Sequence, residues 1–387
     1  AETYEEPEFV IDMTAPVVSI SNVSQYAAYS DVVAPTISYS DTNFDPTFTT
    51  YLLTGGRSGA NAYVNGINEQ DEATSRTVSF PDFEHTLEMD DVYVLDAQMT
   101  DLAGNQAQQS VTFSVNRYGS TYLLTDESGN MLGSYLNRPQ DVVVHEINPS
   151  GLDQSAGHAE VVHDSEVASL TPNADYQVGT GIDSDSWSDT TYTFPARLFN
   201  EDGYYRILLT SHDLAGNLSQ NTMDAKNVNR DDTAEIAFAI DSTAPTADLV
   251  GITSYGVYLD PQKTVMVSTG DNLAIAHVEV LIDGEQIDSW ENPSESDLST
   301  PSVALEADGE PHDIELVVVD RAGNQSRITY DGVVVTGDLL TFVLNTPRLL
   351  FGSVAGVIVA AAVAALGIAL ALRHHRLTRD KNNPFGH

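Results

Sequence analysis

A five-residue motif that occurs three times constrains this chain more than any other feature. The copies are Asp101-Leu-Ala-Gly-Asn105, Asp213-Leu-Ala-Gly-Asn217 and Asp320-Arg-Ala-Gly-Asn324, and they begin 112 and 107 residues apart. A motif that returns at the size of a domain indicates a tandem array. The chain therefore contains related units of about 110 residues rather than one large domain.

The residues before each copy alternate in register with the motif, as a half-buried strand does. The aligned positions are Tyr93, Leu95, Ala97 and Met99; Tyr205, Ile207, Leu209 and Ser211; and His312, Ile314, Leu316 and Val318. Ala-Gly-Asn is then the turn after this strand, because Gly and Asn tolerate the positive φ of tight turns. The motif thus predicts a strand followed by a tight turn in every unit.

The unit boundaries follow from a second repeated signal. Phe9-Val-Ile-Asp12 before Met-Thr-Ala-Pro16 matches Phe238-Ala-Ile-Asp241 before Ser-Thr-Ala-Pro245, where one unit closes and the next opens. We therefore predict the end of a preceding repeat or linker at 1–13 and three units at 14–115, 116–241 and 242–336. The second unit is the most divergent, since it starts without Thr-Ala-Pro and holds a hairpin-like turn at 126–130.

Short strands separated by turn residues at this spacing predict an all-β fold of tandem immunoglobulin-like sandwiches. In the third unit the expected strands are 264–268, 277–282, 302–306, 311–320 and 326–335, with a turn at Asp283-Gly284. Tyr93 and Tyr205 each lie eight residues before the repeated Asp, where a tyrosine corner belongs, and His312 replaces them in the third unit.

Leu349 to Leu372 has no charged residue and is long enough for a transmembrane helix. The basic tail 373–387 follows it, which satisfies the positive-inside preference and places the C-terminus in the cytoplasm. The alternative is a buried core helix. Residues 337–348 would be a juxtamembrane spacer, and Gly352 and Gly356 form a GxxxG pair that could join two helices in a homodimer.

The composition excludes several classes of function. The chain has no cysteine, so it has no disulfide, thiolate metal site or thiol nucleophile. Residues 1–372 hold 12 basic and 56 acidic residues, a net charge of −44, which argues against binding nucleic acid. No catalytic motif such as HExxH, G-x-S-x-G or a P-loop occurs, so we expect no enzyme.

The pairing of D-x-A-G-N with I-D-x-T-A-P resembles bacterial immunoglobulin-like domains, which are repeated in the stalks of surface adhesins and large anchored surface proteins. The resemblance covers most of residues 9–336. The resemblance implies a stalk that presents an N-terminal region and meets an unidentified protein or glycan ligand, and together with the apolar segment 349–372 it predicts a single-pass cell-membrane protein with the stalk outside the cell. Because the chain opens at the end of a repeat and lacks a signal peptide, we interpret it as part of a longer surface protein. Two alternatives stay open: the non-catalytic anchor region of a large surface enzyme, such as a polysaccharide hydrolase or protease, and a carbohydrate-binding array.

Aspartates at the unit junctions are candidate calcium ligands. In such sandwiches the loops after the second and sixth strands lie beside the preceding linker, which would bring together Asp241, Asp271 and Asp320 in the third unit and Asp12, Asp41 and Asp101 in the first; the second unit offers Asp213 with Asp153. Ca²⁺ takes six to eight oxygen ligands, and the resemblance implies interdomain calcium as a cofactor that stiffens a stalk. The alternative is that these aspartates only cap turns.

The loop Asp183-Ser-Asp-Ser-Trp-Ser-Asp189 partly resembles a calcium-binding loop. It lacks the glycine at position 6 and has Trp187 at position 5. We therefore favour a polar loop in which Trp187 packs against the fold.

Overall fold

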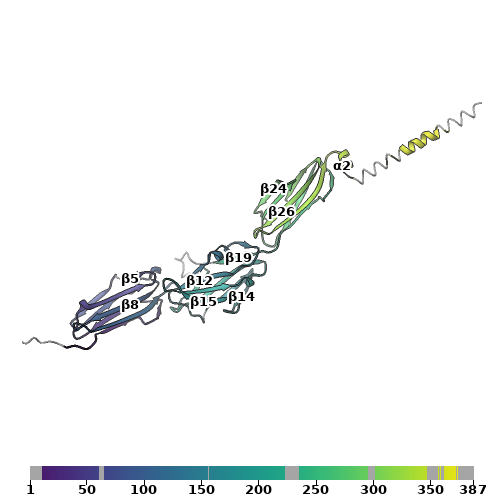
Figure 1. Ribbon diagram of the computed structural model, residues 1–387. Helices are drawn as coiled ribbons and strands as arrows, with labels where there is room; N and C mark the ends of the chain where they lie inside the picture. The colour runs from purple at the N-terminus through teal and green to yellow at the C-terminus, as the bar shows by residue number, and fades with distance from the viewer. Residues whose placement is uncertain are drawn as a thin grey trace, which may run out of the picture. The chain divides into compact units, whose positions relative to one another are not determined.

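The chain folds into β-sandwiches, which belong to two compact parts, Ala1–Asp241 and Ser242–His387. Figure 1 shows the computed structural model, which describes residues 11–60, 65–155, 157–222, 235–294, 301–346, 356, 358, 361–371 and 373. Residues 1–241 hold two sandwiches and residues 242–387 hold one. We call them the first, second and third sandwich in chain order.

The first sandwich packs a four-stranded sheet on a five-stranded sheet. The first sheet has the order β1 (Val17–Ser21), β3 (Thr36–Ser40), β7 (Ser75–Ser79) and β6 (Asn68–Glu72). The second has the order β2 (Ala28–Tyr29), β9 (Gln106–Val115), β8 (Asp91–Thr100), β4 (Thr49–Gly55) and β5 (Gly59–Ala60). Two short 3₁₀ turns, Pro46–Phe48 and Leu87–Met89, connect strands.

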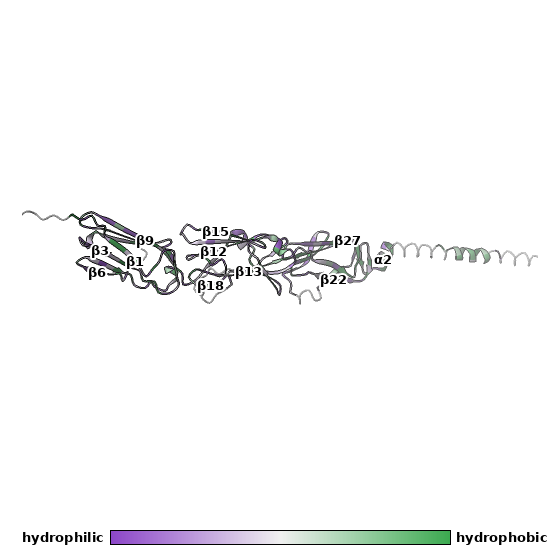
Figure 2. Cartoon of the chain, turned by 90° about the horizontal axis from the view of Figure 1, so that it is seen from below, coloured by the Kyte–Doolittle hydropathy of each residue, from purple (hydrophilic) through white to green (hydrophobic). Residues whose placement is uncertain are grey.

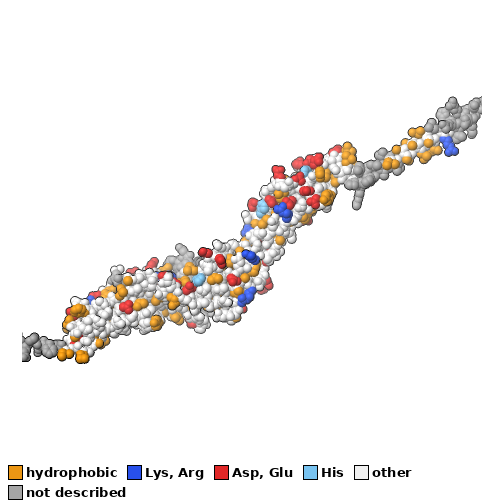
Figure 3. Space-filling model, viewed as in Figure 1, with side chains coloured by type: hydrophobic (Ala, Val, Ile, Leu, Met, Phe, Trp, Pro, Cys, Tyr) orange, Lys and Arg blue, Asp and Glu red, His pale blue; other side chains and the backbone are white. Residues whose placement is uncertain are grey.

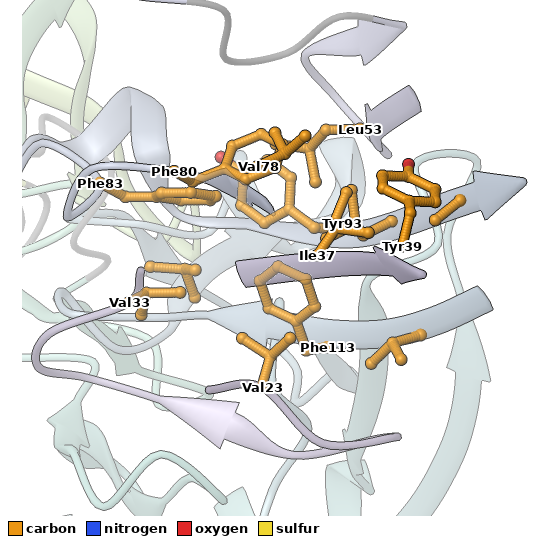
Figure 4. Close-up of a cluster of buried hydrophobic side chains, with 14 of the residues drawn as sticks. Val23, Val33, Ile37, Tyr39, Leu53, Val78, Phe80, Phe83, Tyr93 and Phe113 are labelled. Carbon is orange, nitrogen blue, oxygen red and sulfur yellow. The ribbon is translucent and has the colours of Figure 1, made fainter. Parts of the chain in front are cut away.

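The core of the first sandwich comes from the alternation seen in the sequence. In β8 the residues Tyr93, Leu95, Ala97 and Met99 are all buried. Tyr93 stacks on Phe113 of the neighbouring strand, with ring centroids 5.7 Å apart, and Ile37 and Val78 of the opposite sheet close over them (Figure 4). The period-two pattern therefore correctly predicted which face of β8 lies inside.

The second sandwich repeats the strand order. One sheet has the order β10 (Thr121–Leu124), β12 (Val142–Asn148), β16 (Ser188–Phe194) and β15 (Gln177–Ile182). The other has the order β11 (Tyr135–Leu136), β19 (Ile236–Ile240), β17 (Gly203–His212), β13 (His158–His163) and β14 (Glu166–Leu170), with β18 (Leu218–Gln220) also paired to β17. The predicted turn at 126–130 is a short helix instead, α1 (Asp126–Gly129), because the Thr125 side chain caps it by accepting a hydrogen bond from Ser128 N. A 3₁₀ turn at Ala196–Phe199 precedes β17.

In the third sandwich, one sheet has the order β20 (Thr246–Val250), β22 (Gln262–Gly270) and β25 (Ser302–Glu306). The other has the order β21 (Val257–Leu259), β27 (Gln325–Thr336), β26 (Asp308–Asp320), β23 (Ile275–Ile282) and β24 (Glu285–Glu291). The five strands expected here are confirmed. The pattern missed β20, β21 and β24, and of these β24 is an edge strand that is mostly exposed and lacks a clear alternation of apolar residues. Asp283 and Gly284 form the expected turn before it, with φ of 53° and 83°.

The two predicted tyrosine corners are confirmed. Tyr93 Oη donates a hydrogen bond to the Met89 carbonyl at 3.0 Å, and Tyr205 Oη donates one to the Glu201 carbonyl at 2.8 Å. In the third sandwich, the His312 ring lies 2.6 Å from Asp283 Oδ2 and 2.9 Å from Asp308 Oδ2. A histidine between two carboxylates therefore takes the position of the corner tyrosine.

The predicted transmembrane segment lies partly outside the described residues, which include 356, 358 and 361–371 of it. Gly352 is among those outside, whereas Gly356 is described as helical and exposed. In the parts of the chain that the structure describes, no helix is long and apolar enough to cross a membrane. Residues 361–371 are helical and carry exposed apolar side chains, and Figure 2 shows this segment in the colour of hydrophobic residues. In the predicted spacer, α2 (Leu339–Asn345) is capped at its N-terminus by Asp338, whose carboxylate accepts a hydrogen bond from Thr341 N at 2.7 Å.

Candidate metal centre

The repeated motif folds into the same turn in all three sandwiches. The aspartate amide donates a hydrogen bond to the asparagine carbonyl at 2.9, 3.0 and 3.0 Å in the first, second and third copies. The glycine alone of each motif has a positive φ, of 94°, 87° and 86° at Gly104, Gly216 and Gly323. The sequence therefore correctly predicted a tight turn, although the asparagine serves it with hydrogen bonds rather than with an unusual backbone conformation.

The aspartate side chain of each motif caps this turn. One carboxylate oxygen, Oδ1, accepts a hydrogen bond of 2.8 Å from the asparagine backbone amide in every copy. The other, Oδ2, accepts one from the asparagine side-chain amide at 2.8, 2.9 and 2.7 Å. The turn-capping interpretation is thus confirmed for Asp101, Asp213 and Asp320. These hydrogen bonds do not use the full acceptor capacity of the three carboxylates, because a carboxylate oxygen has two lone pairs and can accept more than one bond.

In the first sandwich, Asp101 lies beside two further carboxylates. Asp12, Asp41 and Asp101 come from the segment before β1, the loop after β3 and the turn after β8, and each offers an oxygen within 4.8 Å of the other two. Asn43 orders the group: its backbone amide donates to Asp41 Oδ1 at 2.6 Å, and its side-chain amide donates to Asp12 Oδ2 at 2.6 Å. Sequence reasoning brought these three aspartates together but missed Asn43.

The hydrogen bonds around this first group favour ionised carboxylates. Those from the Thr14 amide and the Asn43 side chain lower the pKa of Asp12. At Asp101, burial acts to raise the pKa, but hydrogen bonds from Asn105, Ala103 and Gly104 outweigh it, so that the pKa is lowered. In the described residues, no basic side chain forms an ion pair with Asp12, Asp41 or Asp101. The group therefore concentrates negative charge, which is costly unless a cation balances it.

Asp271 and Asp320, two of the three aspartates predicted for the second group, lie in the third sandwich with carboxylate oxygens within 4.8 Å of each other, and the third, Asp241, is the last residue of the other compact unit. Asp320 is 2% exposed and Asp271 is partly buried. Asp271 Oδ2 accepts a hydrogen bond from the Leu273 amide at 3.0 Å. Its other oxygen, Oδ1, is buried and has no hydrogen-bond partner in the described part of the chain. A buried carboxylate oxygen without a donor is where a metal ligand is expected, since leaving it unpaired costs free energy.

The carboxylates gathered within each of these two sandwiches fit a calcium ion by distance and by donor type. Ca²⁺–oxygen bonds measure roughly 2.3–2.6 Å, so two oxygens on one ion are at most about 5.2 Å apart. A spread of up to 4.8 Å satisfies that limit. All of these side chains are hard oxygen donors, which suit calcium rather than a thiophilic metal. Backbone carbonyls and water would complete the shell.

Comparison with known proteins identifies the fold of residues 2–119. Residues 2–119 match the family model of the bacterial Ig-like domain, group 3. The first sandwich is a bacterial Ig-like domain. The other two sandwiches repeat its strand order and its D-x-A-G-N turn. A comparison with curated proteins found no match.

Several solved structures are similar at low identity. A tandem repeat from the extending region of a large adhesion protein is 14% identical, with 83% of this chain and 74% of that chain covered and a TM-score of 0.31. The fibronectin(III)-like modules of Clostridium thermocellum CbhA are 13% identical, with 56% and 94% covered and a TM-score of 0.25. The glucan-utilisation protein SGBP-B of Bacteroides ovatus is 14% identical, with 84% and 71% covered and a TM-score of 0.18.

In the second Ig-like sandwich, Asp213 meets amides instead of carboxylates. Its Oδ2 accepts hydrogen bonds from the side chains of Asn116 at 2.8 Å and Asn148 at 3.4 Å. Asp153, the expected partner, instead accepts hydrogen bonds from Ser155. The sequence held a signal for this difference, because Asn116 follows the closing strand of the first Ig-like domain as Asp241 follows that of the second.

The loop 183–189 packs as expected. Trp187 is 1% exposed, and Asp183 Oδ1 accepts hydrogen bonds from the backbone amides of Asp185 and Trp187, both at 2.9 Å. Sequence reasoning did not find its contact, which is with the first Ig-like domain: the Arg57 guanidinium stacks on the indole at 3.5 Å. This loop serves to join two domains.

Proposed function

We propose that this chain is a membrane-anchored extracellular stalk of Ig-like sandwiches that bind calcium where a sandwich meets the segment before it. The observation that carries the proposal is the meeting of Asp12, Asp41 and Asp101, which come from three separate segments of the first sandwich. An ion bound by all three would tie the entering segment to two loops of the sandwich. The chain would then bend less at its point of entry, which is what a spacer needs.

The charge distribution supports an extracellular spacer. Acidic side chains are spread over the visible face of the sandwiches (Figure 3), and the chain carries a net charge of −41. Self-repulsion of this kind keeps repeats soluble and apart. Calcium at millimolar concentration, which extracellular sites require, would offset the charge locally.

The C-terminal part supports an anchor. Residues 349–372 are uncharged, and five of their described apolar side chains are between 56% and 64% exposed: Ile358, Val363, Leu366, Ile368 and Leu370. Such a row needs an apolar environment that the sandwiches do not provide. We propose that the bilayer supplies it, with the basic tail on the cytoplasmic side and the Gly352 and Gly356 pair available for helix dimerisation.

A second candidate function is glycan binding. The second sandwich contains a cavity of about 180 Å³ lined by Tyr176, Tyr192, Asn173 and His158 among others. Aromatic faces beside polar groups are typical of sugar-binding sites. A glycan array with the whole chain in detergent tests this candidate, with Tyr176→Ala as the control variant; binding that does not depend on Tyr176 would reject the cavity.

The calcium proposal is tested by titration of the EDTA-treated chain with CaCl₂ in a calorimeter. Asp41→Asn should remove one bound ion per chain. Asp45→Asn is the matched control, because Asp45 also caps a turn, through Thr47 N at 2.9 Å, but lies outside the carboxylate group. An ion present at 100 times its Kd should stabilise the folded state by about 2.7 kcal/mol. Equal stoichiometry in Asp41→Asn and the parent would reject the site.

A further inference from the structure

The second sandwich carries a version of the carboxylate group in which two aspartates are replaced by asparagines. Asn116 directly follows the closing strand β9, as Asp241 follows β19. Asn148 ends β12, which holds the same place in its sheet as β3 and β22, the strands before Asp41 and Asp271. Asp213 is the motif aspartate. The triplet at this junction is thus Asn, Asn and Asp.

Local hydrogen bonds confirm that these positions are equivalent. Asn148 Oδ1 accepts a hydrogen bond from the amide two residues later, Ser150 N, at 2.8 Å, as Asp41 does from Asn43 N. The motif asparagine Asn217 donates its side-chain amide to the Asn116 carbonyl at 2.8 Å, as Asn105 does to the Asp12 carbonyl at 3.2 Å. The two junctions therefore share a scaffold and differ in the groups at its centre.

The centre of this junction is filled by one amide group. Asn116 Nδ2 lies 2.8 Å from Asp213 Oδ2, 2.8 Å from Ser150 Oγ and 3.1 Å from Asn148 Oδ1. The two hydrogens of an amide NH₂ serve these three oxygens. Asn116 and Asn148 are fully buried, and Asp213 is 5% exposed. A donor group thus stands at the meeting point of the oxygens, where the aspartate triplets present only acceptors.

We infer that the Asn116 side-chain amide takes the place of a cation and closes the junction between the first and second sandwiches without a metal ion. One carboxylate among amides carries a single negative charge, which hydrogen bonds from Asn116, Asn148 and Asn217 satisfy. A trio of carboxylates cannot be satisfied in this way, because ionised carboxylates only accept. The substitution of Asn for Asp therefore converts an ion-dependent junction into a permanent one.

The surroundings of the amide group fit a permanent junction. The loop around Trp187 packs on the first sandwich, and Ser30 Oγ donates a hydrogen bond to the Ala215 carbonyl at 2.8 Å. Gly119, with a φ of 80°, lies so close to Ser219 that an added Cβ would be 2.3 Å from its Oγ. Residues of both sandwiches accordingly belong to one compact unit, Ala1–Asp241. The comparison with an ion-dependent junction rests on the proposed calcium binding, whereas the closed junction at Asn116 rests on its own hydrogen bonds.

The first test is the calcium stoichiometry of Asp213→Asn, measured on the whole chain. We expect it to equal that of the parent, whereas Asp101→Asn, the equivalent change in the first sandwich, should bind one ion fewer. A loss of one ion in Asp213→Asn would overturn the inference. If Asp101→Asn also leaves the number unchanged, the calcium proposal fails by itself.

The second test holds whether or not the parent binds calcium. The double variant Asn116→Asp and Asn148→Asp creates three carboxylates and removes the bridging amide. Its unfolding temperature should fall in EDTA relative to the parent and recover in 5 mM CaCl₂ to a degree that the parent does not show, with about one additional ion bound. The milder Asn148→Asp variant, which keeps the Asn116 amide, covers the case in which the double variant does not fold in EDTA. An unchanged unfolding temperature of these variants in EDTA would overturn the inference.

Discussion

The indole Nε1 of Trp187 donates a hydrogen bond of 2.8 Å to Oδ1 of Asp91, although the two residues are 96 positions apart and belong to different sandwiches. Asp91 is fully buried at the start of β8, and it also accepts bonds from the amides of Arg57 and Ser58. A buried carboxylate of the first sandwich is thus partly satisfied by the second. The stabilities of the two sandwiches should therefore be coupled.

Trp187→Phe should destabilise residues 1–241 by about 1–3 kcal/mol, because the variant keeps an aromatic ring but removes a hydrogen-bond donor from the buried carboxylate of Asp91. Urea unfolding followed by circular dichroism measures the change. Trp290→Phe, in the third sandwich, is the control and should leave residues 1–241 unaffected. Equal midpoints for Trp187→Phe and the parent would show that the indole hydrogen bond contributes nothing.

Gly56→Ala should loosen the same interface. An added Cβ at Gly56 would lie 1.9 Å from the Asp185 carbonyl oxygen, so one backbone must move. We expect a loss of about 1–3 kcal/mol, as for other overpacked sites. Gly129→Ala is the matched control, because nothing lies within 4 Å of its added Cβ. Thermal unfolding should therefore separate the two variants, and similar temperatures for both would contradict the packing seen here.

The third sandwich should lose stability as the pH rises above neutrality. Hydrogen bonds to Asp283 and Asp308 raise the pKa of His312 above its ordinary value of 6.5, although partial burial opposes them. A raised folded-state pKa means that the stabilisation is complete below pH 6.5 and disappears as the pH passes through the raised value. Unfolding of the third sandwich measured from pH 5.5 to 9 checks this.

His312→Tyr is the matching variant, because tyrosine occupies this position in the other two sandwiches. It should remove the decline between neutral and alkaline pH. A decline that persists in the variant would assign the pH dependence to another group.

Tyr93→Phe should cost about 0.5–1.5 kcal/mol, the usual net value of one hydrogen bond. The change removes the bond to the Met89 carbonyl but leaves the stacked ring in the core. Tyr26→Phe, at a tyrosine that is 79% exposed, is the control. Chemical unfolding of the two variants should differ by the value of the corner bond, and indistinguishable curves would mean that the corner is a consequence of the fold without stabilising it.

Much of the fold could be predicted from the sequence. The alternation from Tyr93 to Met99 predicted a strand with one buried face, and the repeated Gly predicted a turn with positive φ. Strand β24 and helix α1 were not predicted correctly, because an exposed edge strand has no apolar alternation and a four-residue helix depends on its cap. The carboxylate groups were predicted from topology, whereas the amide network at Asn116 was not, because asparagine is common in turns.

The sequence by itself determined the local conformations: which residues alternate in a strand, where the chain turns, and how often the unit repeats. These depend on short-range sterics and on the burial of one face, which a linear pattern records. Tertiary structure alone decided which side chains meet at the sandwich ends. Asn116 and Asp213 are 97 residues apart, and their hydrogen bond exists only because the two packed sheets of the second sandwich bring the ends of β12 and β17 together beside the end of β9 of the first sandwich. No local pattern encodes that contact, so the effect of a change from Asp to Asn depends on which side chains the folded protein brings together.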